Sequence, residues 1–308
     1  MPFGTIASAG ASQGGIGTTV IEQIYATATG GSNINYGGGF WFGGRDTTVY
    51  KSDIKSSWTT SSYLGHNNQN AKPSYWNGYY FLPSGNNDGQ WRYSTDISVA
   101  PTTVTMSVTT QRVTTMCYFA SKYYVFNNNG VYWYSSSIGG SWTSGVSGVT
   151  GATYADTDGT TMVVVAQSGQ MASTTNGTTW TTRTSSFGTT DINFIKYDPE
   201  TTYWVASGAT GTAAYSANGT TGWTQITHGL GTAAANTINR CNGRFIISQA
   251  SASATTIRYS KSASSLPTST FTAEAAITST GISAASFVLA TDGNHVLNST
   301  GKSAVYSR

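Results

Sequence analysis

The stretch GTTMVVVAQSGQMASTTNGTTW, residues 159–180, contains the unit that repeats along this chain. An apolar segment, Gly159–Val165, follows a turn, and a second apolar segment then runs into a polar turn rich in Ser, Thr, Asn and Gly. Short runs of β-branched and apolar residues between such turn residues are typical of β-strands. The stretch therefore predicts two strands joined by a short turn.

The same unit occurs seven times. The apolar segments are GGGFWFG (37–43), NGYYFL (77–82), SKYYVF (121–126), GTTMVVV (159–165), ETTYWVA (200–206), NGRFIIS (242–248) and DGNHVLN (292–298). The second strands end near Tyr-Ser, at Tyr50, Tyr93, Tyr134, Ala172, Tyr215, Tyr259 and Tyr306, which gives intervals of 43, 41, 38, 43, 44 and 47 residues. A strand-rich repeat of this length is typical of a propeller blade. We predict an all-β, seven-bladed β-propeller of four-stranded antiparallel blades.

The N-terminal segment predicts how the ring closes. Middle repeats continue past Tyr-Ser into a strand that begins Trp-Thr, whereas the last repeat stops at residues 306–308. Residues 18–26, TTVIEQIYA, read as a strand that belongs to no repeat of its own. We expect this strand to complete the last blade, because closure removes the open sheet edges on which aggregation starts.

The domain organisation follows from that assignment. Residues 18–308 form one propeller domain, with repeats over about 33–308. Residues 1–17 are mostly Gly, Ala and Ser without a period, which predicts a flexible attachment arm. Its candidate apolar anchors are Phe3 and Ile16.

Composition limits the partners. Only 9% of residues are charged and the net charge is +3, which is too weak to indicate nucleic-acid binding or an acidic lipid surface. Aromatic residues make up 13% of the chain, so a core can form. No apolar segment approaches the roughly 18–20 residues that span a bilayer, and the opening lacks the basic start and apolar stretch of a secretion signal. We expect neither membrane insertion nor a signal peptide.

Two polar turns carry a resemblance to a known family. Residues 173–180, STTNGTTW, and 216–223, SANGTTGW, resemble the Asp-box, S-x-D-x-G-x-x-W, of sialidase-like (BNR) propellers, with Asn in place of Asp. The Asp-box is structural in that family, which implies turn and packing roles here for Asn176, Gly177, Trp180, Asn218, Gly219 and Trp223. We expect the tryptophans at the equivalent position to be mostly buried between blades: Trp58, Trp142, Trp180 and Trp223.

Chemistry-bearing residues are sparse. A sialidase would need an arginine triad, a Tyr–Glu pair and an acid, and these cannot be carried onto positions of this sequence. Glu occurs three times, at Glu22, Glu200 and Glu274, and no facing pair of carboxylates suggests itself. The run Asp156–Gly159 resembles the start of a calcium loop without its remaining ligands, and we interpret it as a hairpin turn. We therefore predict no enzyme activity, metal or cofactor.

Isolated histidines and cysteines fit the same interpretation. His66, His228 and His295 fall in three different repeats, so no metal-binding spacing exists among them. Cys117 and Cys241 fall in nearly opposite repeats, and we expect buried free thiols.

Loops rich in Asn and aromatic residues are the best candidates for ligand binding. Amides beside aromatic faces suit sugar hydroxyls, although the same residues also serve in turns and blade cores. The candidate glycan or partner residues are His66, Asn67, Asn68, Asn70, Trp76, Asn86, Asn87, Trp91, Asn127, Asn128, Asn129 and Trp133.

The function that fits these features is a structural protein of a tailed-phage virion, as a capsid or tail decoration or a fibre-like tip. The opening MPFGTIASAGASQGG, which leads into VIEQIYATA, resembles openings of phage particle proteins. We expect a virion-surface location, contact with other virion proteins through the arm, and possible recognition of host-surface glycans. The alternatives are a carbohydrate-binding adhesive propeller outside a virion and, less favoured, a sialidase-type glycosidase.

Overall fold

The structure is a computed structural model that describes residues 17–21, 33–45, 48–52, 59–61, 72–83, 86–107, 110–232, 235–241, 243–250, 256–273, 277–278, 289–291, 296–298 and 303–307. Its regular elements are strands, apart from two single 3₁₀ turns, η1 (Gln167–Gly169) and η2 (Ala209–Gly211). The predicted all-β class is confirmed. No helix in these ranges is long and apolar enough to cross a membrane.

Most strands form four-stranded antiparallel sheets joined in chain order. The first sheet contains β2 (Asn33–Gly37), β3 (Phe40–Arg45), β4 (Thr48–Ser52) and β5 (Thr59–Ser61). The second contains β6 (Ser74–Trp76), β7 (Tyr79–Pro83), β8 (Gln90–Ser94) and β9 (Thr102–Thr105). The third sheet contains β10 (Val113–Phe119), β11 (Lys122–Asn127), β12 (Val131–Ser135) and β13 (Thr143–Val146). The fourth contains β14 (Ala152–Thr157), β15 (Met162–Ala166), β16 (Met171–Thr174) and β17 (Thr181–Arg183).

The remaining strands continue the series. A fifth sheet contains β18 (Ile192–Asp198), β19 (Tyr203–Gly208), β20 (Ala213–Ser216) and β21 (Thr224–Gln225). A sixth contains β22 (Ala235–Cys241), β23 (Arg244–Ala250), β24 (Thr256–Ser262) and β25 (Phe271–Ala273), with β26 (Ile277–Thr278) also paired to β24. Two pairs complete the list: β27 (Leu289–Thr291) with β28 (Val296–Asn298), and β1 (Gly17–Ile21) with β29 (Ser303–Ser307).

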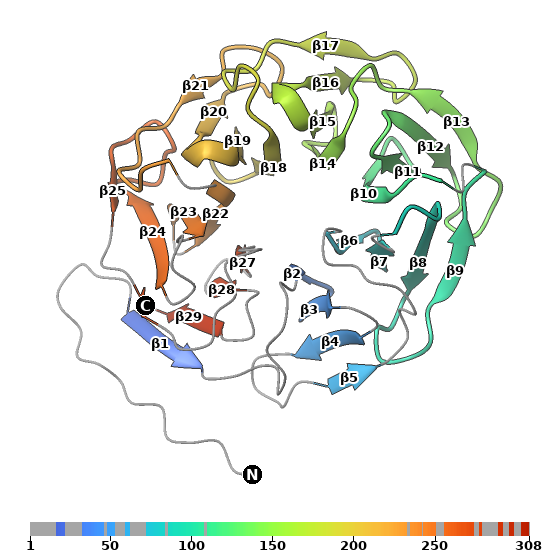
Figure 1. Ribbon diagram of the computed structural model, residues 1–308, viewed down its shortest axis with the longest axis horizontal. Coiled ribbons are helices and arrows are strands. Elements are labelled where there is room, and N and C mark those ends of the chain that lie inside the picture. The colour runs from blue at the N-terminus through green and yellow to red at the C-terminus, as the bar shows by residue number, and fades with distance from the viewer. Residues whose placement is uncertain are drawn as a thin grey trace.

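The sheets stand side by side in a ring, with the first strand of each at the centre and the fourth at the rim (Figure 1). Neighbouring first strands contact one another in the order β2, β6, β10, β14, β18, β22 and β27, and β27 also contacts β2. Four-stranded sheets arranged around an axis in this way define a β-propeller.

The predicted strand pairs are the second and third strands of the sheets. The predicted segment 121–126 falls on β11. The predicted second strand, which ends near Tyr134, falls on β12, and Tyr124 lies opposite Tyr134. The segment 159–165 begins three residues early, because Gly159–Thr161 belong to the turn before β15. These pairs form because their apolar residues are buried on both faces between adjacent sheets.

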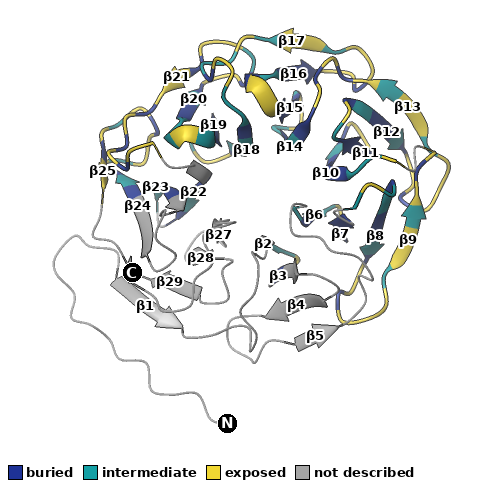
Figure 2. Cartoon of the chain, in the orientation of Figure 1, coloured by how far each residue is buried: buried dark blue, intermediate teal, exposed yellow. Residues whose placement is uncertain are grey.

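Burial is greatest in the second and third strands and lowest at the rim (Figure 2). All five residues of β15 are buried, whereas β9 and β13 on the rim are largely exposed. The interior consists of apolar layers between neighbouring sheets, such as Val163 and Val165 of β15 against Ile195 of β18. In the sheets whose burial the structure describes, the stabilising burial therefore lies in the first three strands.

A β-bulge recurs in the inner strands. The register shifts at Val113/Thr115 in β10, Ala152/Tyr154 in β14, Ile192/Phe194 in β18 and Ala235/Thr237 in β22. In β14 the bulged Thr153 donates its hydroxyl to the carbonyls of Val165 at 3.1 Å and Ile192 at 2.5 Å, which ties β14 to its own sheet and to the next. A bulge increases the local twist and so helps a short strand fit around the axis.

The two ends of the described chain meet in one sheet. β1 pairs antiparallel with β29, with Thr18 opposite Tyr306 and Ile21 opposite Ser303. β29 in turn lies against β28. The predicted strand covered 18–26; residues 22–26 lie outside the described ranges, as do Phe3 and Ile16 of the arm.

Candidate functional site

The up-and-down strand order separates the loops into two faces. Turns between first and second strands, and between third and fourth strands, lie on one face, which we call the hairpin face. Turns between second and third strands, together with the segments that join one sheet to the next, lie on the opposite face, which we call the connector face. The described candidate glycan residues Asn86, Asn87, Asn128 and Asn129 all belong to the connector face.

Backbone hydrogen bonds link neighbouring sheets along the connector face. Gly89, in the turn between β7 and β8, donates to the carbonyl of Gln111, just before β10, at 2.9 Å. The bond from Asn128 to the Arg112 carbonyl, at 3.0 Å, instead extends the β10–β11 ladder within one sheet. Farther round, Gly151, just before β14, donates to the Asn128 carbonyl of the preceding sheet at 2.9 Å, whereas the bond from Gln167 to the Gly151 carbonyl, at 3.0 Å, joins the ends of β14 and β15 within one sheet. These turns therefore hold adjacent sheets together, which leaves a smaller part of them available for a ligand.

The predicted glycan residues differ in how far they are exposed. Trp91 and Trp133 are core residues, exposed by 0% and 2%, so their rings offer no face to a sugar in this structure. Asn127 is also fully buried, and its Oδ1 accepts from the backbone N–H groups of Asn129 and Val131. Asn87 and Asn129 are exposed and keep the glycan prediction open. Trp76 is half-buried, and His66, Asn67, Asn68 and Asn70 lie outside the described residues.

The Asp-box-like turns lie on the hairpin face and share one hydrogen-bond pattern. Asn218 Oδ1 accepts from the N–H groups of Thr220 and Thr221, both at 2.9 Å, while Ser216 Oγ accepts from Gly219 N at 3.1 Å. In the preceding sheet, Asn176 Oδ1 and Thr174 Oγ1 make the same contacts. Thr174, rather than Ser173, is therefore the counterpart of Ser216. Side-chain oxygens that bond their own backbone two or three residues on stabilise such turns.

These turns pack onto neighbouring rings. Gly177 has a φ of +77°, and a Cβ there would lie 1.8 Å from the Tyr124 hydroxyl, so glycine is required. Trp180 packs edge-on against Phe126 of the preceding sheet, with ring centroids 5.8 Å apart. Trp142 packs in the same way against Trp91 at 5.4 Å. Trp223 is buried and Trp142 and Trp180 are half-buried, as expected; Trp58 lies outside the described residues.

Carboxylates in the described part of the chain serve as turn and strand acceptors. Asp158 Oδ1 accepts from Thr160 N and Thr161 N at 2.8 and 2.7 Å in a hairpin turn. This turn covers 158–161 rather than the predicted 156–159, because Asp156 and Thr157 belong to β14. Further carboxylate-to-backbone contacts are Asp88 with Gln90 N, Asp96 with Ser98 N, Asp156 with Tyr197 N, Asp191 with Ser168 N and Asp198 with Thr201 N. Each of these groups is held by the backbone it stabilises.

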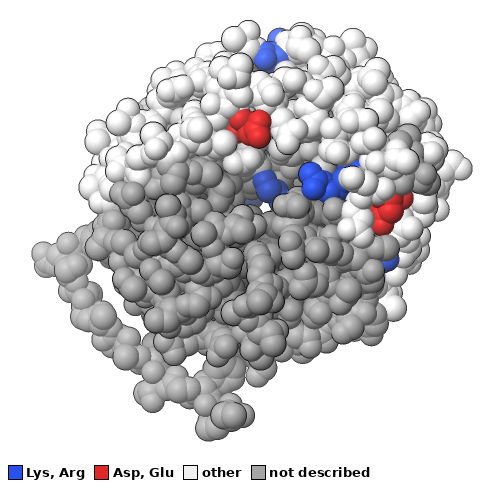
Figure 3. Space-filling model, viewed as in Figure 1, with Lys and Arg blue, Asp and Glu red and all other residues white. Residues whose placement is uncertain are grey.

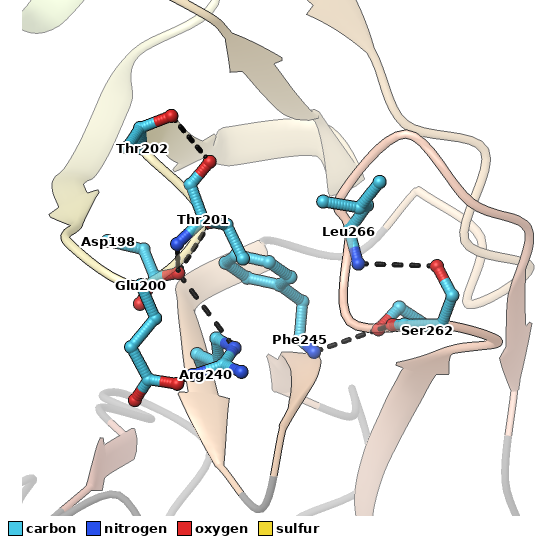
Figure 4. A network of polar contacts seen from close by, with 9 residues as sticks. Asp198, Glu200, Thr201, Thr202, Arg240, Phe245, Ser262 and Leu266 are labelled. Atoms are coloured by element: carbon cyan, nitrogen blue, oxygen red, sulfur yellow. Dashed lines mark hydrogen bonds and ion pairs between the residues drawn. The ribbon is translucent and has the colours of Figure 1, made fainter.

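Glu200 takes part in an ion cluster between two sheets (Figure 4). It forms an ion pair with Arg240 on β22, and Asp198 Oδ2 lies 3.8 Å from Arg240 Nε. Asp198 also accepts the Thr201 hydroxyl at 2.5 Å. Arg240 contacts both carboxylates, which lie at the end of β18 and in the turn that follows it. The cluster therefore links β18 to β22 of the next sheet.

Asp156 and Lys72 are among the titratable groups whose pKa values are perturbed near the axis. Burial raises the pKa of Asp156 to about 6, with Lys196 acting in the opposite direction. Burial lowers the pKa of Lys72 to about 7. The Lys72 ammonium donates to the Asn193 carbonyl and lies 5.4 Å from the Tyr154 ring centroid, so it reaches from the start of β6 to β14 and β18. In the part of the face that Figure 3 describes, Lys and Arg atoms lie near the centre, and few other charged side chains are visible.

The isolated thiols and the described histidine have ordinary structural roles. Cys117 and Cys241 are buried thiols, as predicted. Burial raises the pKa of the Cys117 thiol, which keeps it protonated at neutral pH. His228 bonds the Gly211 carbonyl through Nε2 at 2.5 Å and accepts from Leu230 N at 3.2 Å. Among the described side chains, no group of three or more His, Cys, Asp or Glu residues could hold a metal ion.

Comparison with solved structures supports the fold. Virginiamycin B lyase from Staphylococcus aureus superposes with a TM-score of 0.77 at 9% identity, over 94% of this chain and 99% of that one. A streptogramin B lyase gives 0.76 at 9% identity, over 94% and 97%. YCF48 from Cyanidioschyzon merolae gives 0.63 at 10% identity, over 93% and 98%. At these identities the likeness shows a propeller fold alone. No protein-family model and no curated protein matches the sequence.

Sequence reasoning missed two features of the site. The first strands were not predicted, because polar residues interrupt their apolar pattern, as in ATYADT of β14. The position of Lys72 at the axis has no local signal, since its neighbours come from segments far along the chain.

Proposed function

We propose that this chain is a non-enzymatic structural component of a tailed-phage virion, which displays a seven-bladed propeller. The observation that carries the non-enzymatic part is the use of the described carboxylates, each of which contacts backbone or an arginine within the fold. Acid–base hydrolysis needs a carboxylate that is free to exchange a proton with a substrate.

Seven blades and a closed ring complete this proposal. The cycle of contacts from β2 through β27 and back to β2 supports seven inner strands. The β1–β29 pairing, next to β28, supports a last blade built from both ends of the chain. Such closure leaves the predicted arm, residues 1–17, as the tether, with its last residue, Gly17, already part of β1 at the rim (Figure 1).

The virion part rests on the sequence: a Gly/Ala/Ser arm, an opening that resembles phage particle proteins, and a surface of Ser, Thr and Asn. Its test is mass spectrometry of purified particles, followed by localisation on intact particles by cryo-microscopy. A chain lacking residues 1–16 should fold and be absent from particles, whereas the Ser144→Ala variant on the exposed rim should incorporate normally. Recovery of the full chain in a cell-envelope fraction, and not in particles, would favour an adhesive propeller instead.

Host glycan recognition through the connector face is the second part of the proposal. Asn87 and Asn129 are exposed there, and replacing both with Ala leaves the buried Asn127 contacts in place. The double variant should lose signal on a glycan array, and Ser144→Ala should retain it. Equal signal from both variants would remove the connector face from the proposal.

A further inference from the structure

A groove on the rim lies between two neighbouring sheets. It has a volume of about 380 Å³ and is lined by Thr182, Arg183, Thr184, Ser185, Ser186, Thr220, Thr221, Gly222 and Trp223. The first wall is the end of β17 and the segment after it; the second is the Asp-box-like turn that precedes β21. This volume is in the range of roughly 300–1,000 Å³ that small-molecule sites occupy.

Both walls are held in place by contacts outside the groove. Ser185 Oγ donates to the Gly169 carbonyl at 2.7 Å, and Gln225 Nε2 donates to the Ser186 carbonyl at 2.6 Å. On the opposite wall, Asn218 fixes Thr220 and Thr221 through their backbone N–H groups. A ligand would meet a preorganised surface, which lowers the entropy cost of binding.

Arg183 distinguishes this groove from its counterparts. It lies opposite Met171, the first residue of β16. The same position holds Thr105 opposite Gln90 and Val146 opposite Val131. Within the described outer strands, only β17 therefore places a cation there. Arg183 Nε donates to Ser173 Oγ at 2.8 Å, and none of the ion pairs in the described ranges includes Arg183.

Unpartnered polar atoms accompany this arginine. Ser186 Oγ is buried without a hydrogen-bond partner among the described residues, and the same holds for Trp223 Nε1. The indoles of Trp142 and Trp180 are also unpartnered, so the indole alone does not distinguish the groove. The unpartnered Ser186 hydroxyl is the more informative group, because buried polar groups normally have a hydrogen-bond partner.

We propose that this groove binds a saccharide unit that carries one carboxylate, such as a hexuronate. The two Nη atoms of Arg183 match a carboxylate in bidentate geometry. The threonine and serine hydroxyls suit ring hydroxyls, and Trp223 supplies an apolar edge. A phosphate, with a charge near −2, would call for two cations. The lining contains a single cation, Arg183, which matches the single charge of a carboxylate. The proposal rests on the proposed recognition of host-surface glycans, which supplies the sugar. It concerns the rim groove rather than the connector face.

The test uses the purified full chain and saturation-transfer NMR. D-Glucuronate should bind, and D-glucose, which has a CH2OH group in place of the carboxylate, should bind about tenfold more weakly or not at all. Arg183→Ala should abolish the preference for glucuronate, while Arg183→Lys should retain part of it. Arg244→Ala removes the same charge from a different sheet and should change nothing.

Three results would overturn the proposal: unchanged glucuronate binding in Arg183→Ala, acetate binding as tightly as glucuronate, or tighter binding of N-acetyl-glutamate amide than of glucuronate. The second would indicate a simple anion site and the third a peptide site. Thr182→Trp, which fills the groove from the exposed rim, gives an independent check, because it should block glucuronate and leave Arg183 in place. None of these results depends on particle incorporation, so failure here leaves the proposed display function open.

Discussion

The inner and outer strands of the same sheets differ sharply. β15 is entirely buried, and the neighbouring β14 bears Asp156 and the bulged Thr153, which contact the next sheet. β13 at the rim is largely exposed, and its Val146 is 73% exposed. The comparison teaches that stability depends on the centre of the ring, whereas the rim is free to vary and to acquire a binding groove.

The largest effect should come from the second strands. Trp204 in β19 is fully buried beside Tyr197, with ring centroids 5.4 Å apart. Trp204→Ala should lower the free energy of unfolding by about 3–5 kcal/mol, measured by urea denaturation, because it leaves a large cavity. The half-buried Trp142 is the matched control, and Trp142→Ala should cost less. Equal costs would show that burial does not fall toward the rim in the way the structure indicates.

Asp156 provides a pH-dependent test of the inner strands. Its folded pKa of about 6 lies above the unfolded value of about 4, so its contribution to stability is present below pH 4 and lost as the pH rises through 6. Asp156→Asn cannot titrate and keeps an acceptor for Tyr197 N. Relative to wild type, this variant should gain about 2–3 kcal/mol in unfolding free energy between pH 4 and pH 8. Thermal unfolding across this range measures it. A constant difference would contradict the raised pKa.

The turn at Gly177 lies between the two regions, because it starts at β16 and packs on Tyr124 of the preceding sheet. Gly177→Ala should cost about 1–3 kcal/mol, since alanine is strained at positive φ and meets the Tyr124 hydroxyl. Gly159 also has positive φ but open space around its Cβ, so Gly159→Ala measures the backbone part alone. Tyr124→Phe should recover part of the Gly177→Ala loss in a double-mutant cycle. Strict additivity would exclude the contact.

The smallest effect should be at the rim. Val146→Thr on β13 should change the free energy of unfolding by no more than about 0.5 kcal/mol, because the side chain is mostly exposed. Chemical denaturation, compared with the wild type in the same buffer, is sufficient. A loss above about 1 kcal/mol would mean that the rim contributes to the core after all.

Much of the fold could be predicted from local pattern. The second and third strands stand out because they are buried on both faces and therefore lack polar interruptions, as in MVVVA of β15. The Asx turns at Asn176 and Asn218 are also local, since each bonds its own backbone. Even here the predicted alignment of the two turns was one residue off. It placed Ser173 opposite Ser216, whereas Thr174 makes the equivalent hydrogen bond, and the sequence allows either hydroxyl at that position.

The candidate sites were less predictable. Asn127 and Trp133 look like binding residues in sequence, yet both are buried, because an amide or indole in a turn carries no mark of which way it faces. Arg183 is an ordinary residue until β17 and the 220–223 turn are placed side by side.

The sequence by itself determined the β class, the repeat and the turn chemistry, because these depend on residues close to one another along the chain. Only the tertiary structure decided which residues share a surface. The reach of Lys72 to Asn193 and the groove beside Arg183 both join segments from different repeats. Contacts of this kind depend on how the sheets pack around the axis, and no local pattern encodes that geometry.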